Sequence, residues 1–230
     1  MKKISLYIFS GLGTDERIFR NIHFPEFVDV HFVTWKKPER KESLEKYIDL
    51  LLEEFDLTNP IVLLGLSFGG VVVQEVSKKI NPLATIIISS LSTSQEMPWY
   101  FRMYGNLKLN KITPFGFLKS LSFFSNRIFG AKSSDSKKLI REIMHDADLT
   151  LVKWQIEKIL SWRSEKPPLN FFHLHGDSDK LLPLKNKNVN AIIRGGTHLM
   201  IYNNAAEIEK IIERQLEKDY REFNALKQLP

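Results

Sequence analysis

The sequence predicts an α/β protein with a mostly parallel sheet of about six strands, helices on both faces of the sheet, and an inserted helical cap. Short runs rich in β-branched and aromatic residues alternate with amphipathic helical segments, which is typical of a parallel sheet. The length of 230 residues fits one α/β unit with an insertion better than two domains. An aromatic-rich block from about 92 to 165 interrupts the alternation and predicts the cap.

Six runs are short and apolar enough to be strands buried on both faces. They are residues 4–9, 28–34, 61–64, 84–89, 169–174 and 189–193. The first run follows a basic start and superficially resembles a signal peptide, but its apolar stretch is short and leads into charged residues without an A-x-A-like cleavage site. We therefore interpret it as a strand and predict a cytoplasmic protein.

Helical segments lie between several of these strands. After Ser43, apolar residues recur at helical spacing up to residue 55. A second helical run covers 71–80 and ends at the Asn-Pro pair 81–82. From Ala205 onward an apolar stripe predicts a closing amphipathic helix. We expect all three helices to pack on the sheet.

The block 92–165 comes after the carboxyl end of a predicted strand, where an insertion lies over the ligand-binding edge of an open α/β sheet. Two prolines, Pro167 and Pro168, separate it from the next strand. We predict a core made of 1–91 and 166–230 and a cap made of 92–165. The cap's aromatic side chains are expected to form mainly a small core of their own, with some facing an apolar substrate pocket.

Composition excludes several classes of protein. Thirty-three basic and 27 acidic residues give a net charge of +6, but the basic residues are scattered, so we predict no nucleic-acid partner. The absence of cysteine excludes disulfides, thiolate nucleophiles and cysteine-based metal sites. No apolar run approaches the roughly 20 residues of a membrane-spanning helix, so no integral membrane association is expected. The oligomeric state stays open.

The segment 65–69 reads GLSFG, a G-x-S-x-G motif between a predicted strand and a predicted helix. In this context the glycines permit a sharp turn that projects the hydroxyl of Ser67 from the edge of the sheet. A serine hydroxyl is a weak nucleophile and needs a base, which in turn needs an orienting group. The alternative is that Ser67 only caps the following helix.

Two later turns offer the missing groups. Asp177 and Asp179 follow one predicted strand in HGDSD, and His198 follows the last strand in GGTH. Either aspartate could merely form the turn, and His198 could be an ordinary loop histidine. His173 and His175 could join the two aspartates as metal ligands, although a catalytic triad explains the same turn more fully.

On these residues the sequence resembles the α/β-hydrolase family, over nearly the whole chain apart from the cap. The order serine, aspartate, histidine is that of the family. GLSFG matches its nucleophile motif, HGDSDKLLP its H-G-x-x-D turn, GGTH its terminal G-x-H loop and SGLGTDERIF its oxyanion loop. The resemblance implies Ser67 as nucleophile, His198 as base, and Asp179 as orienting acid with Asp177 in reserve.

The resemblance further implies an oxyanion hole made by the backbone N–H groups of Leu12 and Phe68, and neither a cofactor nor a metal. Two features depart from the family pattern. Ser10 stands where many members have histidine, and the turn after the second strand lacks the usual acidic, glycine-rich pattern. Because the first matched strand comes at once, we expect a compact version without the early antiparallel strands of larger members.

The implied activity is that of a serine hydrolase, which cleaves a small carboxylic ester or thioester through an acyl-enzyme on Ser67. The substrate is expected to be a small molecule with an apolar portion. Since the imidazole must be neutral to accept a proton, activity should rise from mildly acid toward neutral or alkaline pH. Two alternatives stay open: a carbon–carbon bond hydrolase or lyase with the same triad, and a non-catalytic receptor for a small ligand on the same scaffold.

Overall fold

The computed structural model describes residues 3–107, 127–184 and 188–226. In chain order the elements are β1 (Ile4–Phe9), the 3₁₀ helix η1 (Glu16–Phe19), β2 (Val28–Phe32), α1 (Leu44–Leu52), β3 (Ile61–Leu66), α2 (Phe68–Ile80), β4 (Ala84–Ile88), the 3₁₀ helix η2 (Ser94–Glu96), α3 (Trp99–Asn106), α6 (Ser134–Asp146), α7 (Leu149–Ser161), β5 (Phe171–Gly176), β6 (Ala191–Ile193), α8 (Met200–Asn203) and α9 (Ala205–Leu226).

The strands form a six-stranded sheet in the order β2-β1-β3-β4-β5-β6, and every neighbouring pair is parallel. The predicted sheet is confirmed, with shifts at some strand ends. β3 continues to Leu66 because Gly65 and Leu66 still pair with β4. β5 starts two residues later than predicted, at Phe171, because Asn170 has a φ of 51° that extended backbone does not allow.

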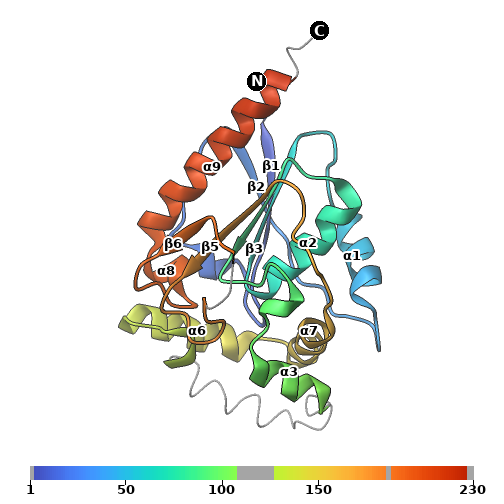
Figure 1. Ribbon diagram of the computed structural model, residues 1–230, viewed down its shortest axis with the longest axis vertical. Helices are drawn as coiled ribbons and strands as arrows, with labels where there is room; N and C mark the ends of the chain where they lie inside the picture. The colour runs from blue at the N-terminus through green and yellow to red at the C-terminus, as the bar shows by residue number, and fades with distance from the viewer. Residues whose placement is uncertain (1–2, 108–126, 185–187, 227–230) are drawn as a thin grey trace.

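Helices cover both faces of the sheet, as predicted (Figure 1). The alternation of side chains along β1 divides the core, since Leu6 and Ile8 pack with α9 while Tyr7 and Phe9 pack with α1 and α2. The long helix α9 closes the first face through Ile208, Ile212 and Leu216. The second face is closed by α2, which runs back from the end of β3.

The helices α3, α6 and α7 lie at the end of the molecule where the strands finish, opposite the two chain termini (Figure 1). α7 is tied to the sheet's second face by Trp154, whose ring centroid lies 4.4 Å from that of Tyr47 and whose Nε1 donates to the carbonyl of Glu42 at 3.0 Å. Trp162 donates to Glu75 on α2 at 2.7 Å.

The expectation that the aromatic residues of 92–165 pack mainly on one another is therefore wrong for Trp154, whose ring belongs to the core on the second face of the sheet. Trp162 donates outside the insertion as well, but its ring packs against Met97 and Phe101 of the insertion and Val71 of α2. Several further aromatic residues of that expectation, at 115, 117, 123 and 124, lie outside the described residues. In the parts of the chain that the structure describes, no helix is long and apolar enough to cross a membrane.

Candidate active site

Ser67 occupies a tight turn between β3 and α2. Its φ of 51° lies in the left-handed region, which is costly for a residue with a side chain. Three hydrogen bonds hold this backbone: the Ser67 N–H donates to the carbonyl of Ile88 at 2.9 Å, and the Ser67 carbonyl accepts from the Gly70 N–H at 2.9 Å and from the Ser90 hydroxyl at 2.6 Å. The surrounding backbone thus fixes the turn.

The glycines of the motif are required by close backbone approach. A Cβ atom on Gly65 would lie 2.4 Å from the carbonyl oxygen of Gly69, and one on Gly69 would lie 2.3 Å from the carbonyl oxygen of Phe9. Both distances are far shorter than any tolerable contact with backbone. Only glycine at these two positions lets the first turn of α2 fold back against the ends of β3 and β1.

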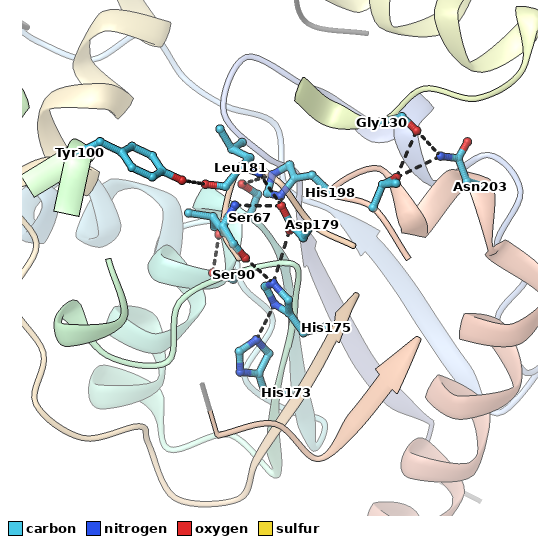
Figure 2. A network of polar contacts seen from close by, with 12 residues as sticks. Ser67, Ser90, Tyr100, Gly130, His173, His175, Asp179, Leu181, His198 and Asn203 are labelled. Carbon is cyan, nitrogen blue, oxygen red and sulfur yellow. Dashed lines mark hydrogen bonds and ion pairs between the residues drawn. The ribbon is translucent and has the colours of Figure 1, made fainter. Parts of the chain in front are cut away.

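Ser67, His198 and Asp179 lie in one hydrogen-bonded chain (Figure 2). The Ser67 hydroxyl oxygen is 2.9 Å from Nε2 of His198, and Nδ1 of His198 is 2.8 Å from Oδ2 of Asp179. The three residues follow β3, β6 and β5, so the carboxyl edge of the sheet brings them together. The helix-cap interpretation of Ser67 is wrong, because its side chain makes no cap hydrogen bond to α2.

The Asp179 side chain is fully buried and its acceptor capacity is well used. Its Oδ1 accepts from the N–H groups of Leu181 and Leu182, at 2.9 and 2.8 Å. Burial by itself raises the pKa of Asp179, but the charge of His198 and hydrogen bonds from His175, His198 and the Leu182 backbone outweigh it and hold the pKa well below its usual range. The Asp179 side chain is therefore held as the carboxylate anion.

Asp177, the other candidate acid, faces elsewhere. Its Oδ1 accepts from the N–H of Gly195 at 2.7 Å and from the Ser178 hydroxyl at 3.0 Å, which ties the turn after β5 to the loop after β6. The geometry thus selects Asp179 as the partner of His198 and gives Asp177 a part in joining the two loops.

His173 and His175 lie on β5, below Asp179 in Figure 2. Both are fully buried. Nε2 of His175 is 2.8 Å from the carbonyl of Leu182, Nδ1 of His175 is 3.1 Å from Nε2 of His173, and Nδ1 of His173 is 3.2 Å from the carbonyl of Asn188. The histidines thus brace the Asp179 turn.

The metal interpretation requires His173, His175, Asp177 and Asp179 to converge. They do not: Nε2 of His175 lies 3.4 Å from Oδ2 of Asp179, but Asp177 faces Gly195, and His173 contacts His175 and the carbonyl of Asn188. Among the residues with described positions, no group of three or more histidine, aspartate or glutamate side chains could hold a metal ion.

Leu12 and Phe68, the predicted oxyanion donors, border the same cavity as Ser67. Phe68 is the first residue of α2, so its N–H has no acceptor within the helix. Leu12 belongs to the loop after β1, which runs beside the nucleophile turn: a Cβ atom on Gly11 would lie 3.4 Å from Cβ of Ser67. Both N–H groups thus belong to backbone that lies close to Ser67.

The loop after β1 is held at its base by Ser10. The Ser10 hydroxyl donates to the carbonyl of Thr14 at 2.7 Å and accepts from Nε1 of Trp35 at 2.7 Å. Ser10 therefore closes the loop on itself and links it to the segment after β2. The loop is thus supported at its base by hydrogen bonds.

A cavity of about 450 Å³ opens from Ser67 and His198. Its wall is almost entirely apolar and comes from both the sheet edge and the inserted helices. The lining residues of α3, α6 and α7 are Tyr100, Phe101, Tyr104, Ile140, Met144, Ile156, Ile159 and Leu160. The Tyr100 hydroxyl also donates to the carbonyl of Leu181 at 3.0 Å, so α3 is tied to the turn that carries Asp179 (Figure 2).

Two neighbours of the site escape sequence reasoning. The ring of Phe129 stacks on His198 with centroids 5.7 Å apart. Gln155 on α7 is fully buried and accepts a hydrogen bond from the Gly13 N–H at 2.9 Å. A local signal exists only for Gln155, since spacings of three and four residues place it on the apolar side of α7 with Val152 and Ile159.

Comparison with known proteins gives structural matches only. No family model matches the sequence, and no match appears among curated proteins. ClbQ from the colibactin pathway has a TM-score of 0.67 and 12% identity over 95% of this chain and 98% of its own. A thermophilic esterase from Thermogutta terrifontis has a TM-score of 0.65 and 17% identity over 94% and 90%. The thioesterase RedJ from Streptomyces coelicolor has a TM-score of 0.62 and 13% identity over 92% and 90%.

The parallel sheet, the serine turn after β3 and these structural matches define the fold class. The chain has the α/β-hydrolase fold. At such low identity the likeness establishes the fold alone, and the chemistry has to be argued from the site.

Proposed function

We propose that this protein is a serine hydrolase that cleaves a small carboxylic ester or thioester through an acyl-enzyme on Ser67. One observation carries the proposal: the hydrogen-bonded chain from Ser67 through His198 to a buried Asp179, at the end of an apolar cavity. A buried carboxylate that fixes an imidazole, which in turn contacts a serine hydroxyl, is an arrangement that activates the serine as a nucleophile.

In the first half-reaction the Ser67 oxygen attacks the substrate carbonyl while its proton passes to Nε2 of His198. The carbonyl oxygen becomes negatively charged and is stabilised by the N–H groups of Leu12 and Phe68, each worth on the order of 3 kcal/mol where such donors have been removed. Asp179 keeps the proton on Nδ1 of His198 and stabilises the imidazolium. Collapse of the intermediate expels the alcohol or thiol, which takes the proton from His198.

In the second half-reaction water replaces the alcohol. His198 removes a proton from the water as its oxygen attacks the acyl carbonyl, and the same donors hold the oxyanion. Breaking the bond to the Ser67 oxygen then releases the carboxylic acid and returns the proton to the serine. Atoms balance as ester plus water giving acid plus alcohol, or thioester plus water giving acid plus thiol.

The cavity supports a substrate with an apolar acyl portion. Its wall offers aliphatic and aromatic side chains beyond the reacting groups, and an apolar acyl chain gains free energy by leaving water for such a wall. The residues 92–165 serve in this proposal as a cap over the core of 1–91 and 166–230, because α3, α6 and α7 provide much of the wall. An esterase and a thioesterase among the structural neighbours are compatible with either substrate class.

The test is covalent labelling with a serine-directed fluorophosphonate, followed by peptide mapping. We expect label on Ser67 in the natural protein, no label in Ser67→Ala, and greatly slowed labelling in His198→Ala. Hydrolysis of nitrophenyl esters and of acyl thioesters, measured beside the same variants, identifies the bond that is cleaved. Absence of label together with absence of hydrolysis would favour the receptor alternative and reject the hydrolase.

A further inference from the structure

We propose that Gln155 is a positioning residue that holds the loop 11–14, and with it the Leu12 N–H, in the place needed to stabilise the oxyanion. The inference rests on the proposed function, because it takes Leu12 as one of the two oxyanion donors. Gln155 lies on α7, far from Leu12 in the sequence. Among the described residues, it makes no hydrogen bond to Ser67 or His198.

The contact is direct and local. The N–H of Gly13, next to Leu12, donates to Oε1 of Gln155 at 2.9 Å. Gly13 has a φ of 64°, so the loop turns sharply there and brings its backbone toward α7. A Cβ atom on Gly13 would lie 3.1 Å from the Val152 side chain, which places the loop against one full turn of this helix. The loop 11–14 is thus hydrogen-bonded to Gln155 of α7, and the hydrogen bond from Ser10 to Thr14 holds it at its base.

The second amide atom of Gln155 makes the case stronger. Nε2 is buried and has no hydrogen-bond partner among the described residues, and the whole side chain is fully buried. An unpaired buried donor destabilises a fold by more than one neutral hydrogen bond stabilises it. An apolar side chain of the same size would remove this unpaired donor, although the Gly13 N–H would lose its acceptor. What only the glutamine supplies is an acceptor for the loop.

The helix α7 also forms part of the cavity wall. Ile156, Ile159 and Leu160 of the same helix line the cavity beside Ser67. Trp154 fixes the helix to the sheet through its hydrogen bond to Glu42 at 3.0 Å. Gln155 therefore connects the loop that carries one oxyanion donor to the element that forms the acyl-binding wall.

The experiment is Gln155→Met, which keeps the approximate volume and removes both amide atoms. With nitrophenyl octanoate we expect kcat to fall by about 10- to 100-fold, less than the loss typical of deleting a donor, and KM to stay within about twofold. A trifluoromethyl ketone with the same chain forms an oxyanion on Ser67, so its inhibition constant should rise by a similar factor. The midpoint of urea unfolding should stay close to that of the natural protein, because removal of the unpaired Nε2 offsets the loss of the acceptor of the half-buried Gly13 N–H.

Gln74→Met is the matched control for the stability measurement. Gln74 is also a buried glutamine with one buried amide atom, Oε1, that has no partner among the described residues, but its Nε2 donates to two carbonyls, those of Gly70 and Leu91, at 2.9 and 2.8 Å. The same substitution there should lower the unfolding midpoint, because two carbonyls lose their donor. The two variants thus distinguish a side-chain amide that stabilises the fold, Gln74, from one that positions the loop 11–14, Gln155.

Wild-type kcat in Gln155→Met would overturn the proposal, as would a fall in kcat matched by a fall in the unfolding midpoint. Failure of Ser67 to label in the natural protein would instead reject the proposed function. Hydrogen exchange of the natural protein gives a test that needs no folded variant: the Gly13 N–H should be protected and the Leu12 N–H should exchange faster. Equal, fast exchange of both N–H groups would also overturn the proposal.

Discussion

Replacing Asp219 by asparagine is expected to stabilise the protein at pH 8 and to do little at pH 4. Asp219 lies on α9 and is 7% exposed. Its Oδ1 accepts from Nε2 of Gln215 at 2.8 Å, whereas Oδ2 is buried and has no partner in the described part of the chain. Burial raises the pKa of Asp219 from 3.8 to about 6. The ionised form is therefore unfavourable in the folded protein.

The size of the effect follows from linkage. The Asp219 carboxyl binds its proton more tightly in the folded protein than in the unfolded chain. The free energy of unfolding therefore falls as the pH rises from about 4 to about 6. Above that range the penalty is constant at about 3 kcal/mol, and at pH 4 it is about 0.5 kcal/mol. The side chain of asparagine resembles the neutral acid and keeps the oxygen that accepts from Gln215. The stabilisation by Asp219→Asn should thus be about 2.5 kcal/mol larger at pH 8 than at pH 4.

The assay is urea unfolding of both proteins at the two pH values, with the free energy extrapolated to water. Glu213→Gln, the same change at an exposed carboxylate of α9, serves as the control and should show no such pH difference. Comparing the two pH values removes any constant effect of the new amide. Equal effects of Asp219→Asn at pH 4 and pH 8 would refute the reasoning that burial makes the ionised form of this carboxyl unfavourable in the folded protein.

Three further predictions concern the site. Gly69→Ala should destabilise the fold by about 3 kcal/mol or more, since its Cβ would lie 2.3 Å from the Phe9 carbonyl oxygen; an unchanged urea midpoint would contradict this. Asp179→Asn should lower kcat by about 10⁴-fold at neutral pH, because the wrong tautomer of His198 is then held, and steady-state kinetics with near-normal kcat would exclude Asp179 as the orienting acid. Leu160→Trp should fill part of the cavity and reduce kcat/KM for octanoate esters relative to acetate esters; an unchanged ratio would show that this wall does not contact the acyl chain.

Much of the fold could be predicted from local patterns. The number and the parallel direction of the strands follow from short apolar runs separated by helical segments, because a parallel pair needs a crossover between its strands. The turn at Ser67 could be predicted equally well. Any side chain at Gly65 or Gly69 would collide with backbone, so the turn requires glycine at two fixed positions and is recognisable as a short motif. The start of β5 is harder to predict, because the positive φ of Asn170 depends on tertiary context.

Features that depend on long-range contacts could not be predicted. The Gly13 N–H and Gln155 are brought together only by the position of α7, and neither residue type is unusual by itself. Trp154 and Trp162 fit the pattern of a separate small core, but their indoles donate to Glu42 and Glu75. Such long-range hydrogen bonds cannot be predicted from a sequence pattern, because each involves one isolated residue at either end and produces no repeating spacing.

The most direct test of the central claim is the intact mass of the protein during turnover. The protein would be mixed with nitrophenyl octanoate, quenched in acid within the first turnovers, and analysed by mass spectrometry with peptide mapping. We predict one octanoyl group on the peptide that contains Ser67, and none in Ser67→Ala. Steady hydrolysis by the natural protein with no acylated serine, or undiminished hydrolysis by Ser67→Ala, would contradict the account.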